Sequence, residues 1–145
     1  MEKYSLPRMY ELLLMQVRAD RSMRVMVANQ VESQRLTMME WLTLGVISSG
    51  LRSGLSMSKV AVDLGVSLPQ VTVLVSSLIE LKFVKQQILA SDHRGRQVHV
   101  TLKGKRVLNK LESAVAKTIR IRTKEIPSNR LQAYIQTVEQ LYAPD

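Results

Sequence analysis

The side chains most suited to chemistry are cations and hydrogen-bond donors, and they gather between residues 56 and 104. Two of them, Arg94 and Arg96, stand beside Asp92 and Gly95, which are typical turn residues. A turn of this kind projects from its domain. Arginine at such a tip is attracted to phosphates and to narrow grooves of duplex DNA, because the potential there is negative. The tip predicts contact with a polyanion, although a basic hairpin alone is weak evidence.

Small polar side chains form a second set, from residue 67 to residue 80. Ser67 can cap a helix that tolerates Pro69 in its first turn. Helical spacing turns four apolar residues toward a core: Val71, Leu74, Val75 and Leu78. The opposite face carries Pro69, Val73, Ser76, Ser77 and Glu80, with Gln70 and Thr72 on its flanks. Such a face can approach base edges without bulk, but an ordinary surface helix rich in Ser and Thr fits the pattern equally well.

Other chemistries find little support in the residue types. The chain has no cysteine, which excludes disulfides, thiolate metal sites and redox thiols, and its two histidines make a poor metal site. No Ser/His/Asp set, glycine-rich phosphate loop or carboxylate pair is evident. We therefore expect a protein that is not an enzyme and that needs no cofactor or metal.

The net charge of +9 points in the same direction as the tip. Residues 82–124 hold twelve Lys or Arg and two acids, so this window alone carries +10. Nucleic acid is the leading partner and an anionic membrane surface is second, while a solvated, lysine-rich helix surface is the plain alternative. The sequence shows no signal peptide and no apolar run of membrane-spanning length, so we expect a cytoplasmic protein with no membrane partner.

The elements that must position these residues follow from periodicity and caps. We predict one domain that is mainly α-helical with a small β hairpin. The expected helices cover residues 5–31, 37–48, 56–64, 67–80, 104–125 and 128–142, and the expected strands cover residues 83–90 and 97–101. The hairpin after two short helices is a wing following a helix-turn-helix, which is much stronger evidence for DNA binding than either part alone.

Local signals fix several of these boundaries. Thr37 and Glu40 form a T-x-x-E capping box, and Gly65 is expected in the left-handed conformation after the third helix. The expected buried face of the second helix consists of Met38, Trp41, Leu42, Leu44 and Val46. The eight methionines, including Met38 and Met39, could line an adaptable ligand pocket or simply fill the core.

The two ends of the chain are long amphipathic helices, within residues 1–35 and 105–145. A monomer of this size would have difficulty covering both apolar stripes. Dimerisation through these helices is the economical solution, and packing within one chain is the alternative.

Taken together, the chain resembles the MarR family of winged-helix transcription regulators. The helix-turn-helix order of the family is present as Ala61, Leu64, Gly65, Val66, Ser67, Val71 and Thr72. The wing signature is present as Asp92, Arg94, Val98, Thr101 and Gly104. The entry Leu36-Thr37 to a helix with an aromatic residue is also similar. The resemblance covers essentially the whole chain, with residues 36–104 as the winged helix-turn-helix.

The resemblance implies a role for each candidate residue. The helix from residue 67 would enter the major groove and the wing would touch the minor groove, with Asp92 bracing a hairpin arginine and Arg94 reaching the DNA. The predicted DNA-binding residues are Ser67, Pro69, Gln70, Thr72, Val73, Ser76, Ser77, Lys82, Asp92, His93, Arg94 and Arg96.

Two departures from the family pattern matter. Val73 and Ser77 stand where relatives often have arginines, so base reading would lean on Gln70, Thr72, Ser76 and groove shape. Lys82 stands where relatives often have glycine. A positive φ there would cost roughly 1 kcal/mol and would place Lys82 near a phosphate.

The predicted function is a homodimeric, sequence-specific repressor that binds a pseudo-palindromic operator in double-stranded DNA. By resemblance, a small phenolic or amphipathic effector would relieve repression, in a cleft near Trp41. The alternative is a non-specific architectural nucleoid protein, which the weakly charged recognition helix and the basic surface would suit.

Overall fold

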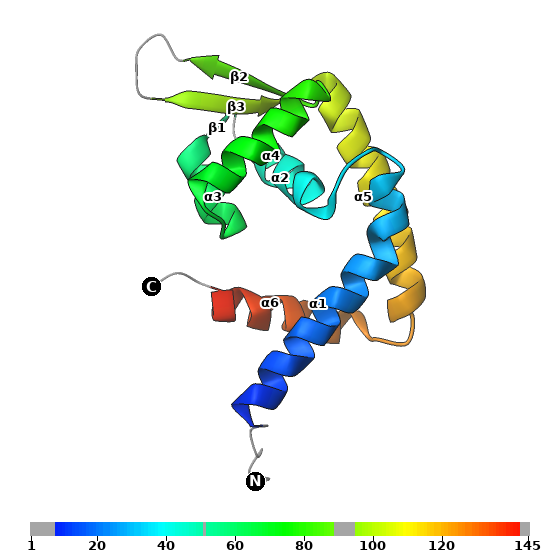
Figure 1. Ribbon diagram of the computed structural model, residues 1–145. Helices are drawn as coiled ribbons and strands as arrows, with labels where there is room; N and C mark the ends of the chain where they lie inside the picture. Colours follow the sequence, from blue (N-terminus) through cyan, green and yellow to red (C-terminus); the bar gives the residue numbers. More distant parts are fainter. Residues whose placement is uncertain (1–7, 51, 89–94, 143–145) are drawn as a thin grey trace.

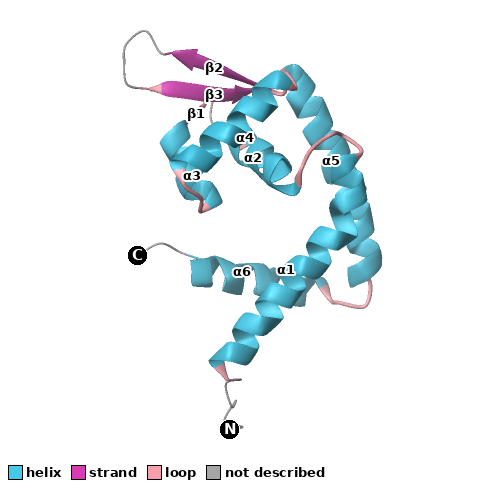
Figure 2. Ribbon diagram, viewed as in Figure 1, coloured by secondary structure: helices cyan, strands magenta, loops and turns pink. Residues whose placement is uncertain are grey.

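The computed structural model describes residues 8–50, 52–88 and 95–142, and its elements are six helices and three strands (Figure 1, Figure 2). In chain order they are α1 (Met9–Glu32), α2 (Met38–Ser48), β1 (Leu55–Ser56), α3 (Met57–Leu64), α4 (Leu68–Glu80), β2 (Val84–Ile88), β3 (Arg96–Val100), α5 (Leu102–Thr123) and α6 (Ser128–Tyr142). The predicted mainly helical architecture with a small hairpin is confirmed.

Residues 36–104, called the head from here on, contain one antiparallel sheet in the order β1-β3-β2. In the hairpin, Val84 lies opposite Val100 and Ile88 lies opposite Arg96. Helices α2, α3 and α4 pack on the sheet. The fully buried centre is built from Leu44, Val60, Val71, Val75, Leu78 and Val98. Because α4 buries one stripe of apolar side chains in this core, its opposite side must face outward.

The helix starts of the head are capped by the side chains expected from the sequence. Thr37 caps α2 in a complete capping box with Glu40, and Ser56 and Ser67 cap α3 and α4. Gly65 ends α3 at φ +66°, the left-handed conformation that glycine adopts without a Cβ penalty. These predictions are confirmed, and together they fix the tight turn between α3 and α4.

Several details differ from the prediction. In α2, Leu42 is 38% exposed, whereas Thr43 and Ile47 are buried, so the buried face is rotated from the one expected. Helix α5 begins at Leu102 rather than at Gly104, because Thr101 is its cap and accepts a hydrogen bond from the Gly104 nitrogen (3.0 Å). Strand β1 is an addition to the predicted elements, since two residues are too few to show a period.

The terminal helices are arranged differently from the head. Figure 1 shows α1 running alongside α5, and a hydrogen bond joins them from Gln30 Nε2 to Thr118 Oγ1 (2.8 Å). Only Val27 and Val31 of α1 are buried. Helix α6 returns beneath the head, where the Tyr142 hydroxyl lies 3.1 Å from the Asp63 carbonyl oxygen, and none of its residues is buried. The two terminal helices therefore leave much apolar surface open.

No single helix in the described ranges is long and apolar enough to cross a membrane. Within the same ranges, only α3 and α4 taken together reach that length and composition, and they are bent by 107° relative to each other.

Candidate nucleic-acid interface

Helix α4 begins with a capping box that also fixes the side chain of Gln70. The Ser67 backbone nitrogen and hydroxyl both lie within hydrogen-bond distance of Gln70 Oε1, at 3.0 and 3.1 Å. The Gln70 backbone nitrogen in turn donates to Ser67 Oγ (3.4 Å). Because the amide oxygen of Gln70 is occupied, the Nε2 group is the part of this exposed side chain that remains to act as a donor.

The exposed face of α4 brings together most of the residues predicted from the sequence. Ser67, Pro69, Gln70, Thr72, Val73 and Ser76 are all exposed. The Thr72 hydroxyl donates to the Leu68 carbonyl (3.0 Å), so its oxygen remains available as an acceptor. Val73 is 71% exposed and can make the apolar contact that a thymine methyl group offers. This face combines donors, acceptors and one apolar side chain, which is the set needed to distinguish base edges.

Ser77 does not share that face, and its predicted outward orientation is wrong. It is half-buried and its hydroxyl donates to Glu40 Oε1 (2.5 Å). The other carboxylate oxygen of Glu40 accepts from the Thr37 backbone nitrogen (2.8 Å). One carboxylate therefore ties the start of α2 to the last turn of α4, and Ser77 helps to hold α4 in place.

The turn after α4 contains the predicted strained residue. Lys82 has φ +63°, as expected from its position, and its side chain is exposed. Residues at the start of α5 bind all three carbonyls of this turn. Lys103 Nζ reaches the Leu81 oxygen (3.1 Å), and the Lys82 and Phe83 oxygens accept from the Thr101 hydroxyl (2.7 Å) and backbone nitrogen (2.9 Å). These bonds stabilise the left-handed turn and join α4 rigidly to α5.

The wing is only partly visible among the described residues. Arg96 is exposed at the first position of β3, opposite Ile88, where a cation can reach a DNA backbone. Asp92, His93 and Arg94 lie outside the described residues, so their predicted roles stay predictions.

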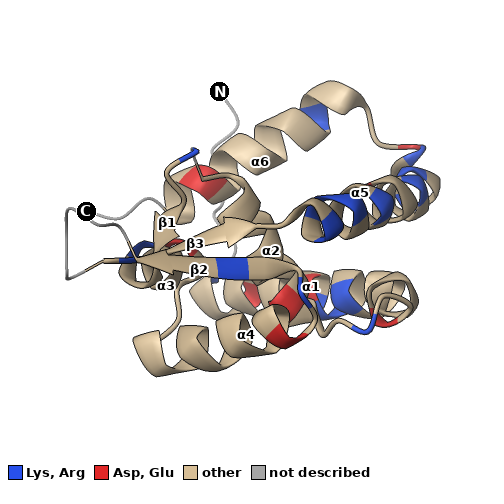
Figure 3. Ribbon diagram, turned by 90° about the horizontal axis from the view of Figure 1, so that it is seen from above, with Lys and Arg blue, Asp and Glu red and all other residues tan. Residues whose placement is uncertain are grey.

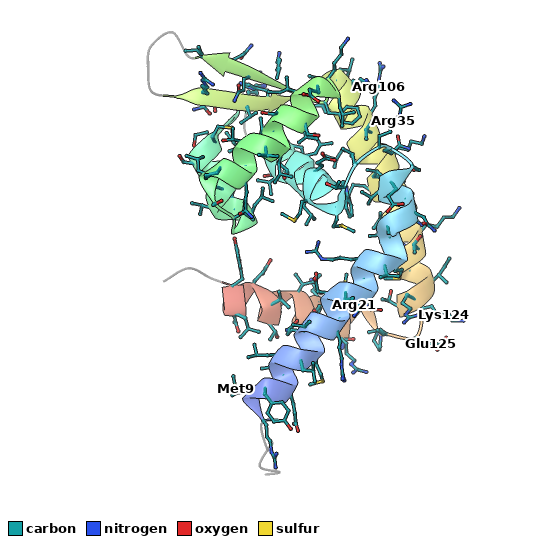
Figure 4. All side chains as sticks on the ribbon, in the orientation of Figure 1. Met9, Arg21, Arg35, Arg106, Lys124 and Glu125 are labelled. Carbon is teal, nitrogen blue, oxygen red and sulfur yellow. The ribbon has the colours of Figure 1, made fainter. Side chains whose placement is uncertain are left out.

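Charge is divided unevenly over the head and the long helices (Figure 3). Helix α4 contains no Lys or Arg and ends with Glu80. Helix α5 carries Lys103, Lys105, Arg106, Lys110, Lys117, Arg120 and Arg122. In Figure 4, Arg106 lies near the head and Lys124 at the opposite end of α5. Sequence reading by α4 would therefore depend on neutral hydrogen bonds, while the cations lie on neighbouring elements.

Two apolar hollows lie where α1 meets α2. The larger, about 350 Å³, is lined by Val25, Ala28 and Met38 among others. The smaller, about 160 Å³, is lined by Met38, Trp41 and Ile119 among others. Trp41 was expected on the buried face of α2. It packs against the core but is only partly buried. Across residues 8–50, 52–88 and 95–142, no three Asp, Glu or His side chains are placed to hold a metal ion.

Solved structures with the same fold are regulators. A MarR-family transcriptional regulator from Rhodococcus sp. RHA1 aligns with a TM-score of 0.84 at 18% identity, over 97% of this chain and 100% of that chain. CouR from Rhodococcus jostii RHA1, bound to p-coumaroyl-CoA, aligns with a TM-score of 0.82 at 19% identity, over 92% of this chain and 93% of that chain. MepR from S. aureus, solved as a complex with DNA, aligns with a TM-score of 0.76 at 17% identity, over 93% of this chain and 97% of that chain.

No protein-family model matches the chain, and no curated protein matches its sequence. At these identities the similarity establishes the fold, which is the winged-helix fold of MarR-family regulators over the whole length of the chain. The resemblance noted in the sequence is thus confirmed at the level of the fold.

Proposed function

We propose that this protein is a MarR-family transcription regulator that binds double-stranded DNA sequence-specifically as a homodimer. The observation that carries the proposal is the exposed face of α4, with Gln70, Thr72, Val73 and Ser76, on a helix that is followed by the β2–β3 hairpin and packs against β2. The capped start of α4 and the turn tied to α5 hold this face rigid, which suits a surface that must fit one groove. MepR, which has the same fold, was solved as a complex with DNA.

Dimerisation is supported by the uncovered apolar side chains of α1 and α6. Leu13, Val17, Ile135 and Leu141 are 61%, 65%, 55% and 66% exposed in the single chain. Apolar patches on this scale mark a protein interface. Two heads related by a two-fold axis would read a pseudo-palindromic operator, with half-sites about one helical turn apart.

Repression relieved by a small molecule is the further part of the proposal. The hollows at the α1–α2 junction are mostly apolar and include the flexible side chain of Met38, which suits an amphipathic or aromatic ligand. Glu40, at the start of α2, contacts Ser77 on α4. A ligand that displaces α2 would therefore also shift the reading helix. CouR, which has the same fold, was solved with p-coumaroyl-CoA bound.

A non-specific architectural DNA-binding protein is the second candidate. The lack of Lys and Arg on α4, together with the basic α5, favours it. Such a protein would bind any duplex through its phosphates, with a steep dependence on salt.

Selection of DNA fragments followed by footprinting separates the two candidates. Purified protein is mixed with a random duplex library and with the DNA upstream of its own gene, and bound fragments are sequenced. The proposal expects a protected, two-fold symmetric site that competes at least about a thousandfold better than random DNA. Uniform protection and no enriched sequence would favour the architectural alternative and overturn the proposal.

A further inference from the structure

A small basic hollow lies where α2 ends, apart from the reading face of α4 and from the apolar hollows near α1. Its volume is about 280 Å³, which suits a small molecule or a single charged group. It is lined by Ile47, Ser48, Gly50, Arg52, Gly54, His99, Val100 and Lys105. These residues come from the end of α2, the following loop, strand β3 and the first turns of α5.

The hollow contains cations without carboxylates. Arg52 and Lys105 both line it, whereas no Asp or Glu appears among its described lining residues. The ion pairs found among the described residues join Asp20 to Arg24, Asp63 to Lys59 and Glu125 to Lys124, so they leave both cations of the hollow unpaired. Two positive charges that line one hollow repel each other, and an anion bound between them would reduce that repulsion.

His99 adds a hydrogen-bonding group that the protein does not use. It lies on the sheet face opposite Val98, which is fully buried in the core. Its Nε2 atom is buried and finds no hydrogen-bond partner among the described residues. This atom lies against Gly54 with almost no accessible surface, so it belongs to the wall of the hollow rather than to its opening.

Two glycines that line the hollow pack closely against neighbouring residues. A Cβ at Gly54, which has φ +78°, would come within 2.7 Å of the His99 imidazole and of the Val98 carbonyl oxygen. A Cβ at Gly50 would come within 2.7 Å of Leu55 Cγ. A larger residue at Gly54 would therefore press on the His99 ring in the wall of the hollow, whereas one at Gly50 would press on Leu55.

The end of α2 would normally oppose an anion, because its last carbonyls are negative. Here those carbonyls are already engaged. The Gly45 and Val46 oxygens accept from the hydroxyls of Ser48 (2.8 Å) and Ser49 (2.7 Å), and the Ile47 oxygen accepts from the Gly50 nitrogen (3.2 Å). The negative end of the helix is thus partly neutralised.

We infer that this hollow binds a phosphate-type oxyanion, held between Arg52 and Lys105, with the His99 ring as part of its wall. The phosphate could belong to a small phosphorylated molecule or to a DNA backbone. This site is separate from the reading helix, so the inference does not depend on the proposed function.

An NMR titration with inorganic phosphate, at an ionic strength kept constant with chloride, tests the site. The imidazole signal of His99 and the backbone amide of Gly54 are the two readings, and replacing His99 with Gln assigns the first. We expect a saturable shift of both signals in the wild type. Arg52→Gln and Lys105→Gln should weaken phosphate binding about tenfold or more, since each removes a charge-assisted hydrogen bond.

Lys110→Gln is the matched control, because it removes the same charge from an exposed position of α5 outside the hollow. It should leave the phosphate affinity unchanged. The inference would be overturned if the NMR shifts rose linearly with phosphate and never saturated. It would also be overturned if Arg52→Gln, Lys105→Gln and Lys110→Gln all bound phosphate with the same affinity. Arg52 is exposed, so thermal unfolding of its variant should match that of the wild type and exclude a folding defect.

A second arm identifies the source of the phosphate. Salt titrations of DNA binding should lose about one unit of log–log slope in Arg52→Gln if the hollow holds a backbone phosphate. An unchanged slope together with lost phosphate binding would assign the site to a free phosphorylated molecule. If the wild-type protein binds no DNA at all, that result counts against the proposed function alone. The NMR titration with inorganic phosphate then remains the test of the hollow.

Discussion

The head and the terminal helices of this chain differ in how they complete their own packing. The head closes around a buried centre, and hydrogen bonds satisfy the ends of its helices at Thr37, Ser56, Ser67 and Thr101. Helices α1 and α6 instead leave long apolar side chains in the open. The head buries its own apolar residues within one chain, whereas the terminal helices leave apolar surface uncovered, as the proposed dimer would require.

The largest effect is expected where the head is most tightly closed, at Gly104. A Cβ there would lie 2.2 Å from the Phe83 carbonyl oxygen, in the turn that joins α4 to α5. We expect Gly104→Ala to destabilise the protein by about 3 kcal/mol in urea denaturation, because the backbone must shift to relieve the overlap. Gly45→Ala in α2 is the control: a Cβ at Gly45 would meet nothing within 4 Å, and the change should gain up to about 1 kcal/mol. Equal effects of the two changes would mean that this turn is not rigid.

The next effect tests whether the terminal helices need a partner. Leu13 is 61% exposed in α1, so Leu13→Glu should spare the fold but place a charge in the proposed dimer interface. Sedimentation equilibrium should give twice 16.4 kDa for the wild type and a dissociation constant raised on the order of a hundredfold for the variant. Ile88→Glu, 70% exposed on the wing, should leave the dimer intact. A wild-type protein that remains at 16.4 kDa at micromolar concentration would contradict the dimer.

A smaller effect separates two neighbouring serines of α4. Ser77→Ala removes the hydroxyl that binds Glu40 and should cost about 1–2 kcal/mol of stability. Ser76→Ala removes an exposed hydroxyl and should leave stability within about 0.5 kcal/mol, while weakening binding to the preferred DNA site. Urea denaturation and DNA titration of both variants make the test. The reverse pattern would mean that Ser77, rather than Ser76, faces the DNA.

The smallest effect concerns the wing tip. Arg94→Ala should reduce the log–log salt slope of DNA binding by about one unit, through the loss of one phosphate contact. Lys124→Ala, at the far end of α5, should leave the slope unchanged. Loss of the negative charge in Asp92→Ala would tighten binding if charge alone mattered. We expect weaker binding at about 0.15 M salt, because an unbraced wing must be ordered on binding. Tighter binding at every salt concentration would exclude the bracing role.

The sequence predicts the head best where the signals are local. The capping box of Thr37 and Glu40 and the left-handed Gly65 each depend on residues within one helical turn, and all are present. The resemblance to the MarR family, whose members often have glycine at this position, raised the possibility of a positive φ at Lys82, and it is found. Most of the predicted α4 residues are also exposed together, because a helical period fixes which side faces the core.

Contacts between distant segments lie beyond such local signals. Ser77 meets Glu40 across 37 residues, and helical spacing alone cannot show that α2 lies there. The rotated face of α2, with Thr43 buried and Leu42 exposed, has the same origin. The sequence gives no sign of the buried Nε2 of His99, which depends on the approach of Gly54 from the loop before β1.

The central claim is that the exposed face of α4 reads DNA sequence, and Gln70→Ala tests it most directly. Fluorescence anisotropy measures the affinity of wild type and variant for the selected operator and for random duplex at one salt concentration. We expect about a tenfold loss of affinity for the operator, from one lost base contact, with little change in affinity for random DNA. Any loss from the weakened α4 cap would appear equally on both duplexes. Equal losses on operator and random DNA would therefore contradict sequence reading by α4.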